Sequence, residues 1–202
     1  MSSSYEEQYY ILLDNPNRDR FLELRGIKDT GKRHYKICKL DHGDGPIFFE
    51  NAYKEDMSFV LGNVQMDSLF PVVSKDIAQE LEYYAIDGFQ LFPSIIVGDD
   101  GTWHEDFYFF NIYDLLDCID FEKSEIRNYK PDSPMHTVLR FKLDSDVLDS
   151  IEEESRLIIN AEGVMSGALL VHERIVRHFN KFDIDAFLLY KLSDYEYGME
   201  YR

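Results

Sequence analysis

Apolar residues follow a helical and then a strand-like pattern in two stretches of the chain, residues 72–92 and 171–190. In the first stretch Ile77, Leu81 and Tyr84 fall at i, i+4 and i+7, a spacing that places them on one face of a helix. Strand-like residues follow in both stretches. Six positions are identical when the second stretch is shifted by 98 residues: Val73/Val171, Ile77/Ile175, Ile86/Ile184, Asp87/Asp185, Phe89/Phe187 and Leu91/Leu189. The pattern predicts one packing unit, a short helix that leads into a strand, present twice.

The residue before each predicted helix indicates how well the N-terminus of that helix is capped. Ser74 is a good N-cap, and Asp76 lies in the first turn, where the helix dipole favours an anion. His172 stands at the position equivalent to Ser74. The second helix is therefore predicted to be less well capped than the first.

Further elements are predicted outside the repeat. Apolar runs predict strands, which we expect at residues 9–13, 35–40, 47–49, 93–97, 103–112, 137–143 and 157–160. Gly98-Asp99-Asp100-Gly101 separates two of these runs and predicts a hairpin. We expect a helical turn at 113–118 and a short helix in the acidic residues 144–154. Residues 51–69 show no firm period, and the polar tail at 193–202 is expected to fray.

Strands that alternate with short helices predict an α+β (mixed α/β) fold. The repeat predicts two related strand–helix–strand lobes around a mixed, mainly antiparallel sheet. We expect an N-terminal lobe at residues 1–122, a polar linker with two prolines at 123–136, and a C-terminal lobe at 137–202. A single compact domain is the alternative.

Composition supports a folded and strongly acidic protein. The chain has 202 residues, of which 45% are hydrophobic and 15% aromatic, enough for a packed core. It carries 21 basic and 39 acidic residues, so its formal net charge is 21 − 39 = −18. A surface of this charge repels nucleic acid and anionic membranes and attracts a basic partner. We therefore expect a protein partner, and neither nucleic acid nor a membrane.

Cysteine usage and the apolar runs predict a cytoplasmic protein. Cys38 and Cys118 lie far apart and have no CxxC companion, so we expect two free thiols. The N-terminus has no basic segment before an apolar run, and no apolar segment reaches eighteen residues.

The sequence contains short patterns that resemble catalytic or metal-binding motifs, but each is better explained by ordinary structure. His172 and His178 are six residues apart, about 240° around a helix, so they do not match the i, i+4 spacing of a zincin helix. Asp99 and Asp100 resemble a calcium loop, but strands and not helices are expected on both sides. Phosphate loops and nucleophile elbows are absent from the sequence. We expect no catalytic residue, no metal and no cofactor.

Acidic residues are the candidate partner-binding residues. The densest run lies between residues 144 and 154, and a second group surrounds the predicted hairpin. A cationic partner could be steered and oriented by these side chains, although a solvated helix face is the alternative for the run. The candidates are Asp144, Asp146, Asp149, Glu152, Glu153, Glu154, Asp99, Asp100, Glu105 and Asp106.

Several of these segments together resemble a family of bacterial immunity proteins from polymorphic-toxin and contact-dependent competition systems. The resemblance rests on four groups of residues: Tyr9-Tyr10-Ile11-Leu12; Val72-Val73-Ser74 followed by Leu81 and Ile86-Asp87-Gly88-Phe89-Gln90-Leu91-Phe92-Pro93; residues 108–112 with Asp117-Cys118-Ile119-Asp120; and Ile184-Asp185-Ala186-Phe187. It spans most of residues 9–190 and contains no catalytic signature. His172 and the acidic segment at 144–154 depart from the family pattern.

The resemblance implies a protein that binds a cognate toxin and neutralises it. Because catalytic motifs are absent from the sequence, we expect no enzymatic activity. Stoichiometric occlusion of a basic toxin by an acidic surface agrees with the net charge. Two alternatives stay open, an enzyme that reverses the toxin's modification of its target and a general acidic nucleic-acid mimic. The identity of the toxin, the face that meets it and the oligomeric state are not determined by the sequence.

Overall fold

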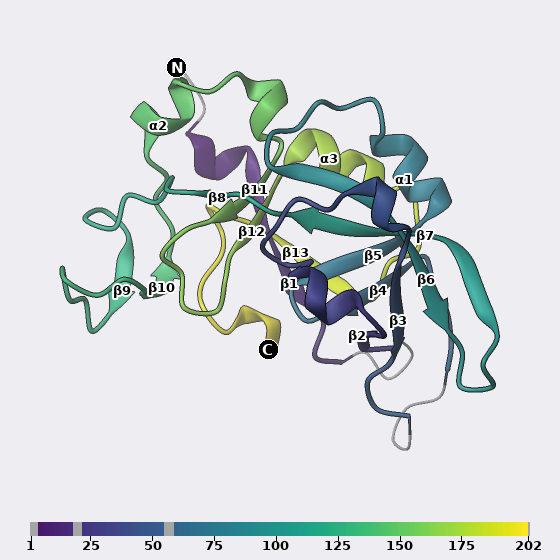
Figure 1. Ribbon diagram of the computed structural model, residues 1–202. Coiled ribbons are helices and arrows are strands. Elements are labelled where there is room, and N and C mark those ends of the chain that lie inside the picture. Colours follow the sequence, from purple (N-terminus) through teal and green to yellow (C-terminus); the bar gives the residue numbers. More distant parts are fainter. Residues whose placement is uncertain (1–3, 18–21, 55–58, 202) are drawn as a thin grey trace.

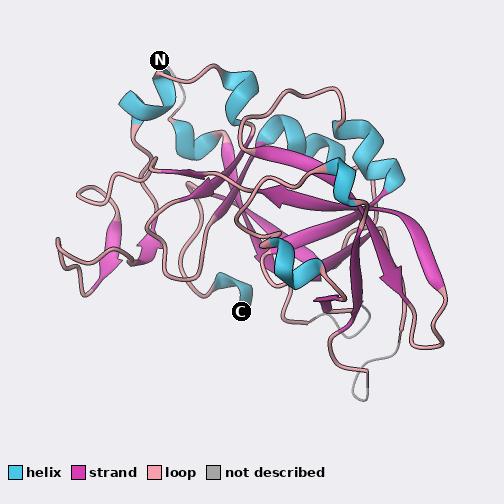
Figure 2. Cartoon of the chain, in the orientation of Figure 1, coloured by secondary structure: helices cyan, strands magenta, loops and turns pink. Residues whose placement is uncertain are grey.

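The computed structural model describes residues 4–17, 22–54 and 59–201 and has a mixed α+β fold (Figures 1 and 2). In this part of the chain most of the regular structure is strand, and the α-helices are α1 (Lys75–Leu81), α2 (Ser145–Asp149) and α3 (Glu173–Phe179). The α+β prediction is confirmed. The single predicted sheet is wrong, because the strands form two larger sheets and a separate two-stranded ribbon.

The two larger sheets are both mixed. The first has the order β2 (Leu24–Ile27), β3 (Ile47–Asn51), β6 (Phe89–Val97), β7 (Trp103–Ile112), β5 (Phe70–Ser74) and β4 (Val64–Asp67). The second has the order β13 (Phe187–Lys191), β1 (Tyr9–Asp14), β12 (Leu169–His172), β11 (Ile158–Ala161) and β8 (Leu115–Leu116). Among the described strand pairs of these sheets, β3–β6 and β11–β8 are parallel and the others are antiparallel. A parallel bridge between Glu23 and Met66 brings the two edges of the first sheet together, so that this sheet is nearly closed. The ribbon pairs β9 (Glu125–Arg127) with β10 (Thr137–Arg140).

Both copies of the repeat have the same order of elements, a hairpin, a helix and a strand. In the first copy β4 and β5 form the hairpin and lead through α1 to β6. In the second copy β11 and β12 form the hairpin and lead through α3 to β13. The structural unit is therefore larger than the sequence repeat, since it includes the hairpin before each helix.

Each unit is completed by a further strand, which comes from a different part of the chain in each copy. In the first copy β7, which follows β6 directly, lies between β5 and β6. In the second copy β1, from the start of the chain, lies between β12 and β13. The registers correspond residue by residue: Val73 is opposite Tyr108 and Val171 is opposite Tyr10, while Leu91 is opposite Phe110 and Leu189 is opposite Leu12. The two units are thus related by a circular permutation.

The two repeated helices lie side by side, as Figure 1 shows for α1 and α3. Glu80 of α1 and His178 of α3 are equivalent in the repeat, and their side chains contact each other, with Oε2 of the glutamate 2.7 Å from Nδ1 of the histidine. A residue that contacts its own equivalent lies close to a two-fold axis. A pseudo-two-fold axis therefore passes between the helices.

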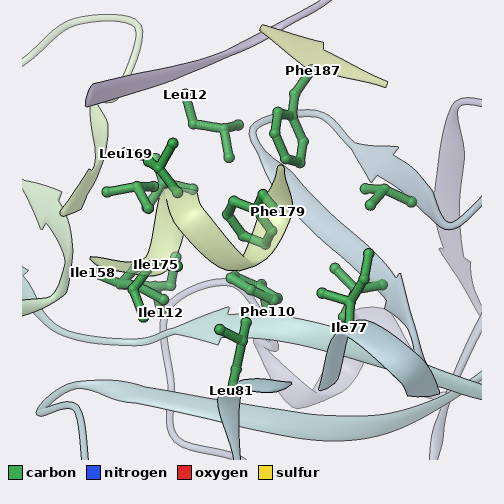
Figure 3. Close-up of a cluster of buried hydrophobic side chains, with 14 of the residues drawn as sticks. Leu12, Ile77, Leu81, Phe110, Ile112, Ile158, Leu169, Ile175, Phe179 and Phe187 are labelled. Atoms are coloured by element: carbon green, nitrogen blue, oxygen red, sulfur yellow. The ribbon is translucent and has the colours of Figure 1, made fainter. Parts of the chain in front are cut away.

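One hydrophobic core is shared by the two copies. Ile77 and Leu81 of the first copy and Ile175 and Phe179 of the second belong to the same buried cluster. Figure 3 shows Phe179 and Phe110 close together in this cluster, with ring centroids 6.0 Å apart. Helices of only seven residues are marginal in isolation, so this packing is what stabilises α1 and α3.

The predicted capping of the two helices is reversed. Ser74 precedes α1, but its side chain makes no capping hydrogen bond, and its buried hydroxyl has no partner among the described residues. His172 caps α3, because its Nδ1 accepts a hydrogen bond from the backbone N–H of Arg174 at 3.3 Å. Burial lowers the pKa of His172, and the neutral ring that results has a nitrogen free to accept.

Several predicted elements are confirmed, and others are wrong. The strand at the start of the chain and the hairpin through Gly98–Gly101 are present as β1 and β6–β7. Residues 35–40 form turns and not a strand, and 113–118 contain β8 and not a helical turn. The segment 51–69 contains β4, although residues 55–58 lie outside the described part. The tail is ordered up to residue 201: Tyr195 is buried, and the backbone N–H of Tyr197 donates to the carbonyl of Leu139.

Candidate functional site

The acidic run folds into α2 and a 3₁₀ turn, η4 (Glu153–Arg156), and two of its carboxylates stabilise local structure. Asp144 is the N-cap of α2, and its Oδ1 accepts from the backbone N–H groups of Asp146 at 2.9 Å and Val147 at 3.3 Å. The hydroxyl of Tyr5 donates to Asp149. These two carboxylates therefore have partners within the chain.

Two more carboxylates of the run bind the second repeated helix. An Nη1 atom of Arg174 on α3 lies 2.9 Å from Glu153 and 2.7 Å from Glu154. The hydrogen bond from Arg174 holds the pKa of Glu153 below its ordinary value. Asp146 and Glu152 are exposed and form no ion pair within the described residues. They are the members of the run that can meet a partner without losing an internal contact.

The acidic residues of the β6–β7 hairpin also include some with partners inside the chain and some without. Asp100 Oδ1 accepts from the backbone N–H of Thr102 at 2.9 Å, which lowers the pKa of this carboxyl. Asp106 has a φ of 64° at a bulge in β7 and pairs with Lys75 at 3.1 Å. Asp99 and Glu105 are exposed and have no ion pair in the described part of the chain.

The two acidic groups do not form one surface. Figure 1 shows α2 at one end of the molecule and the β6–β7 hairpin at the other end. A single small interface cannot include both groups. The acidic residues predicted from the sequence therefore lie on two separate surfaces of the molecule.

A groove between the repeated helices is a further candidate, which the sequence pattern did not indicate. It has a volume of about 600 Å³ and is lined by Asp76, Gln79, Glu80, Tyr83, Tyr84, His178 and Phe182. Tyr83 is 84% exposed, so it can act as an aromatic anchor at an interface. Glu80 is held by Lys181 at 2.6 Å and by His178, and the hydrogen bond from Lys181 is the main cause of its lowered pKa. The groove thus combines a fixed carboxylate with accessible rings.

A smaller cavity of about 330 Å³ lies where the two copies meet. Asp87 and Asp114 contribute carboxylates to its lining, and Ile112 and Ile158 contribute apolar surface. Arg156 also lines it, although this guanidinium is 7% exposed and bonds the Tyr9 hydroxyl at 2.9 Å and the Ile151 carbonyl at 3.1 Å. Its volume is at the lower limit for a small-molecule site.

Groups that often carry chemistry have structural roles here. Burial raises the pKa of the Cys118 thiol to about 12, which removes its nucleophilic form at neutral pH. His172 caps α3 and His178 contacts Glu80, so the two histidines do not converge. Among the described residues no group of three or more His, Cys, Asp or Glu side chains is placed to hold a metal ion. No helix in this part of the chain is long and apolar enough to cross a membrane.

Comparison with known proteins identifies the family. No curated protein matches the chain. The model of the Immunity protein family (Imm11) matches residues 44–149, just over half of the 202 residues. The matched segment contains α1, the β6–β7 hairpin, β9, β10 and α2. On this match, and in agreement with the resemblance of its sequence motifs, the chain belongs to the Immunity protein family (Imm11).

Proposed function

We propose that this protein binds its cognate toxin in a one-to-one complex and blocks it by occlusion, with acidic side chains that meet a basic face of the toxin. Membership of the immunity protein family carries the proposal, because it implies a cognate toxin and its neutralisation. The net charge of −18 supports the basic character of the partner. We place this encounter in the cytoplasm.

The acidic side chains without internal partners are the ones that we assign to the approach of the toxin. These are Asp146 and Glu152 at one end of the molecule and Asp99 and Glu105 at the other. Exposed charges mainly raise the association rate, and their effect weakens as salt rises. Asp144, Asp149, Glu153 and Glu154 contribute to the same field, but their contacts within the chain also fix local structure.

Stoichiometry separates occlusion from an enzymatic reversal of the toxin's effect. We would capture the toxin from the native host on this protein, separate the two by denaturation, refold the toxin and titrate its activity with this protein. Occlusion predicts that activity falls linearly and ends at one equivalent. Full protection at a small fraction of one equivalent would show catalysis instead and would overturn the proposal.

Charge-neutral variants identify the face that meets the toxin. Asp146→Asn/Glu152→Gln and Asp99→Asn/Glu105→Gln each remove two charges, at opposite ends of the molecule, and so serve as controls for each other. We expect one pair to lower the association rate several-fold at about 0.15 M salt and the other to change it little. Equal, small effects of both pairs would contradict an acidic interface. If both pairs lower the association rate equally and strongly, and the wild type also binds many unrelated basic proteins, the general nucleic-acid mimic would be favoured.

A further inference from the structure

The ribbon formed by β9 and β10 carries an exposed cluster whose character differs from that of the rest of the surface. The ribbon lies at one side of the molecule, away from α1 (Figure 1). A cavity of about 270 Å³ opens on it. The cluster, which we call the ribbon cluster, consists of Arg127, Tyr129, Lys130, Met135, His136 and Met165.

The charge of the ribbon cluster is opposite to that of the protein. No carboxylate lines its cavity, whereas the groove between the helices and the cavity between the copies each contain two. Arg127 and Lys130 form no ion pair within the described residues, and Arg127 lies against the ring of Tyr197 at 5.1 Å. In a chain with 39 acidic residues, two adjacent cations without acidic partners are available to an external carboxylate.

The cluster also exposes large apolar side chains. Tyr129 and Met135 are each 45% exposed, and Met165 is 62% exposed. Tyrosine, methionine and arginine are enriched in the cores of protein interfaces, where aspartate, glutamate and lysine are depleted. Methionine adapts its shape to a partner, and tyrosine and arginine are frequent hot-spot residues. Apart from Lys130, the composition of the ribbon cluster is that of an interface core.

Internal contacts hold the cluster in place before any partner binds. The ring of His136 contacts those of Phe121 and Tyr129, with centroid distances of 4.8 and 5.2 Å. The backbone N–H of His136 donates to Gly163 at 2.7 Å, and that of Met165 donates to the carbonyl of His136 at 2.9 Å. These bonds connect the ribbon to the loop that carries Met165. A surface that is already ordered loses less entropy on binding.

We propose that the ribbon cluster is the anchor of the toxin interface and that it binds a toxin surface with apolar side chains around at least one carboxylate. The inference rests on the proposed function. It divides the binding energy between two surfaces: the exposed acids attract the toxin, and the ribbon cluster holds it. The anchor is therefore expected to control the dissociation rate, while the acids control the association rate.

Binding kinetics of the toxin that the wild-type protein captures from its native host, immobilised on a sensor surface, test this division. Met135→Ala/Met165→Ala truncates the exposed methionines, and Arg127→Gln removes one cation. Ile37→Ala is the matched control, because Ile37 is 70% exposed and lies outside the ribbon. We expect the methionine variant to raise koff about thirtyfold or more and Arg127→Gln to raise it at least about tenfold, with unchanged melting temperatures. Asp146→Asn/Glu152→Gln is expected to leave koff within about twofold of the wild-type value.

The outcomes separate the anchor from the proposed function. If the wild type binds the toxin but both ribbon variants dissociate at the wild-type rate, the anchor is wrong and the proposed function stands. If the wild type does not bind the toxin at all, the proposed function fails and the anchor fails with it. A wild-type dimer in sedimentation that Arg127→Gln converts to a monomer would assign the cluster to a second copy of this chain and would overturn the proposal.

Discussion

Gly88 gives a sharp test of how the first repeated unit is built. It has a φ of 67°, and its backbone carbonyl accepts from the N–H of Tyr113 at 2.9 Å. A Cβ atom at this position would lie 2.7 Å from the Cβ of Asp114. The equivalent residue of the second copy is Ala186, which is buried and is not among the residues with positive φ in the described part. The two copies therefore differ here in backbone conformation, and alanine is compatible with only one of them.

The expected loss of stability in Gly88→Ala has two components. The left-handed backbone disfavours alanine by about 1–2 kcal/mol, partly offset by about 0.4–1 kcal/mol from the more restricted unfolded chain. The contact with Asp114 adds about 1–3 kcal/mol for overpacking. Gly101→Ala is the matched control, because Gly101 has a φ of 84° but no atom within 4 Å of the added Cβ. It should lose about 0–1.6 kcal/mol, since only the backbone component and its offset remain.

Urea and thermal unfolding, followed by circular dichroism, measure the difference between these variants. About 2 kcal/mol of extra destabilisation lowers Tm by roughly 4–8 °C in a chain of this length. Asp114→Gly removes the contacting Cβ. In the Asp114→Gly background, Gly88→Ala should therefore cost less stability than in the wild type, by most of the overpacking component. If Gly88→Ala and Gly101→Ala lose equal stability, or if Asp114→Gly recovers nothing, the close approach is not what requires glycine at this position.

Three further predictions concern side chains with defined partners. Tyr35→Phe removes the hydroxyl that donates to Asp67 Oδ2 at 2.5 Å, and because Asp67 is buried we expect a loss of about 1.5–3 kcal/mol in denaturant unfolding; a loss below about 0.5 kcal/mol would contradict this. The folded pKa of Glu80 is depressed, chiefly by Lys181, so the contribution of Glu80 to stability is present above its unfolded pKa of about 4.3 and is lost as the pH falls through the folded pKa. Lys181→Met should raise the Glu80 pKa in an NMR titration, and an unchanged value would show that the ion pair is not formed in solution. In the native protein a thiol reagent should modify Cys38 and leave Cys118 unmodified, because Cys118 is buried with its pKa raised to about 12; two fast-reacting thiols per chain would refute the burial of Cys118.

Local spacing predicted those parts of the fold that local interactions determine. Ile77 and Leu81 lie at helical spacing and are buried in α1, and the glycines at 98 and 101 bound a real hairpin turn. Residues 35–40 look like a strand because they contain Tyr35 and Leu40, but Tyr35 is fixed by Asp67, thirty-two positions away. Distant partners of this kind leave no periodic signal in the sequence.

Long-range pairing explains what the sequence pattern missed in the repeat. The strand equivalent to β7 in the second unit is β1, which precedes the first unit in the chain. A comparison of two successive stretches cannot reveal a strand supplied from the other end of the chain. The signal was present, however, because Tyr10 and Tyr108 are identical and are also 98 positions apart.

The partner-binding residues stay a prediction, and the sequence supports it only through residue type. The sequence gives the number of acids, but it does not show that Arg174 neutralises Glu153 and Glu154 while Asp146 stays free. The polar character and the two prolines of residues 123–136 predict a linker. These residues contain β9, and Met165 reaches the same surface from a separate loop. An interface assembled from two loops has no single sequence motif.

The permuted repeat also indicates where specificity can change without loss of the fold. Residues of α1, α3 and their neighbouring strands are buried in one shared core, so a substitution there alters packing in both copies. The segment from β8 to η4 has no counterpart in the repeat, and it contains the ribbon and the acidic run. Its exposed residues contribute little to the shared core, so substitutions of these residues change the free energy of unfolding only slightly. An immunity protein that must match one toxin and reject others would place its recognition residues in such a segment, because binding can then change independently of folding.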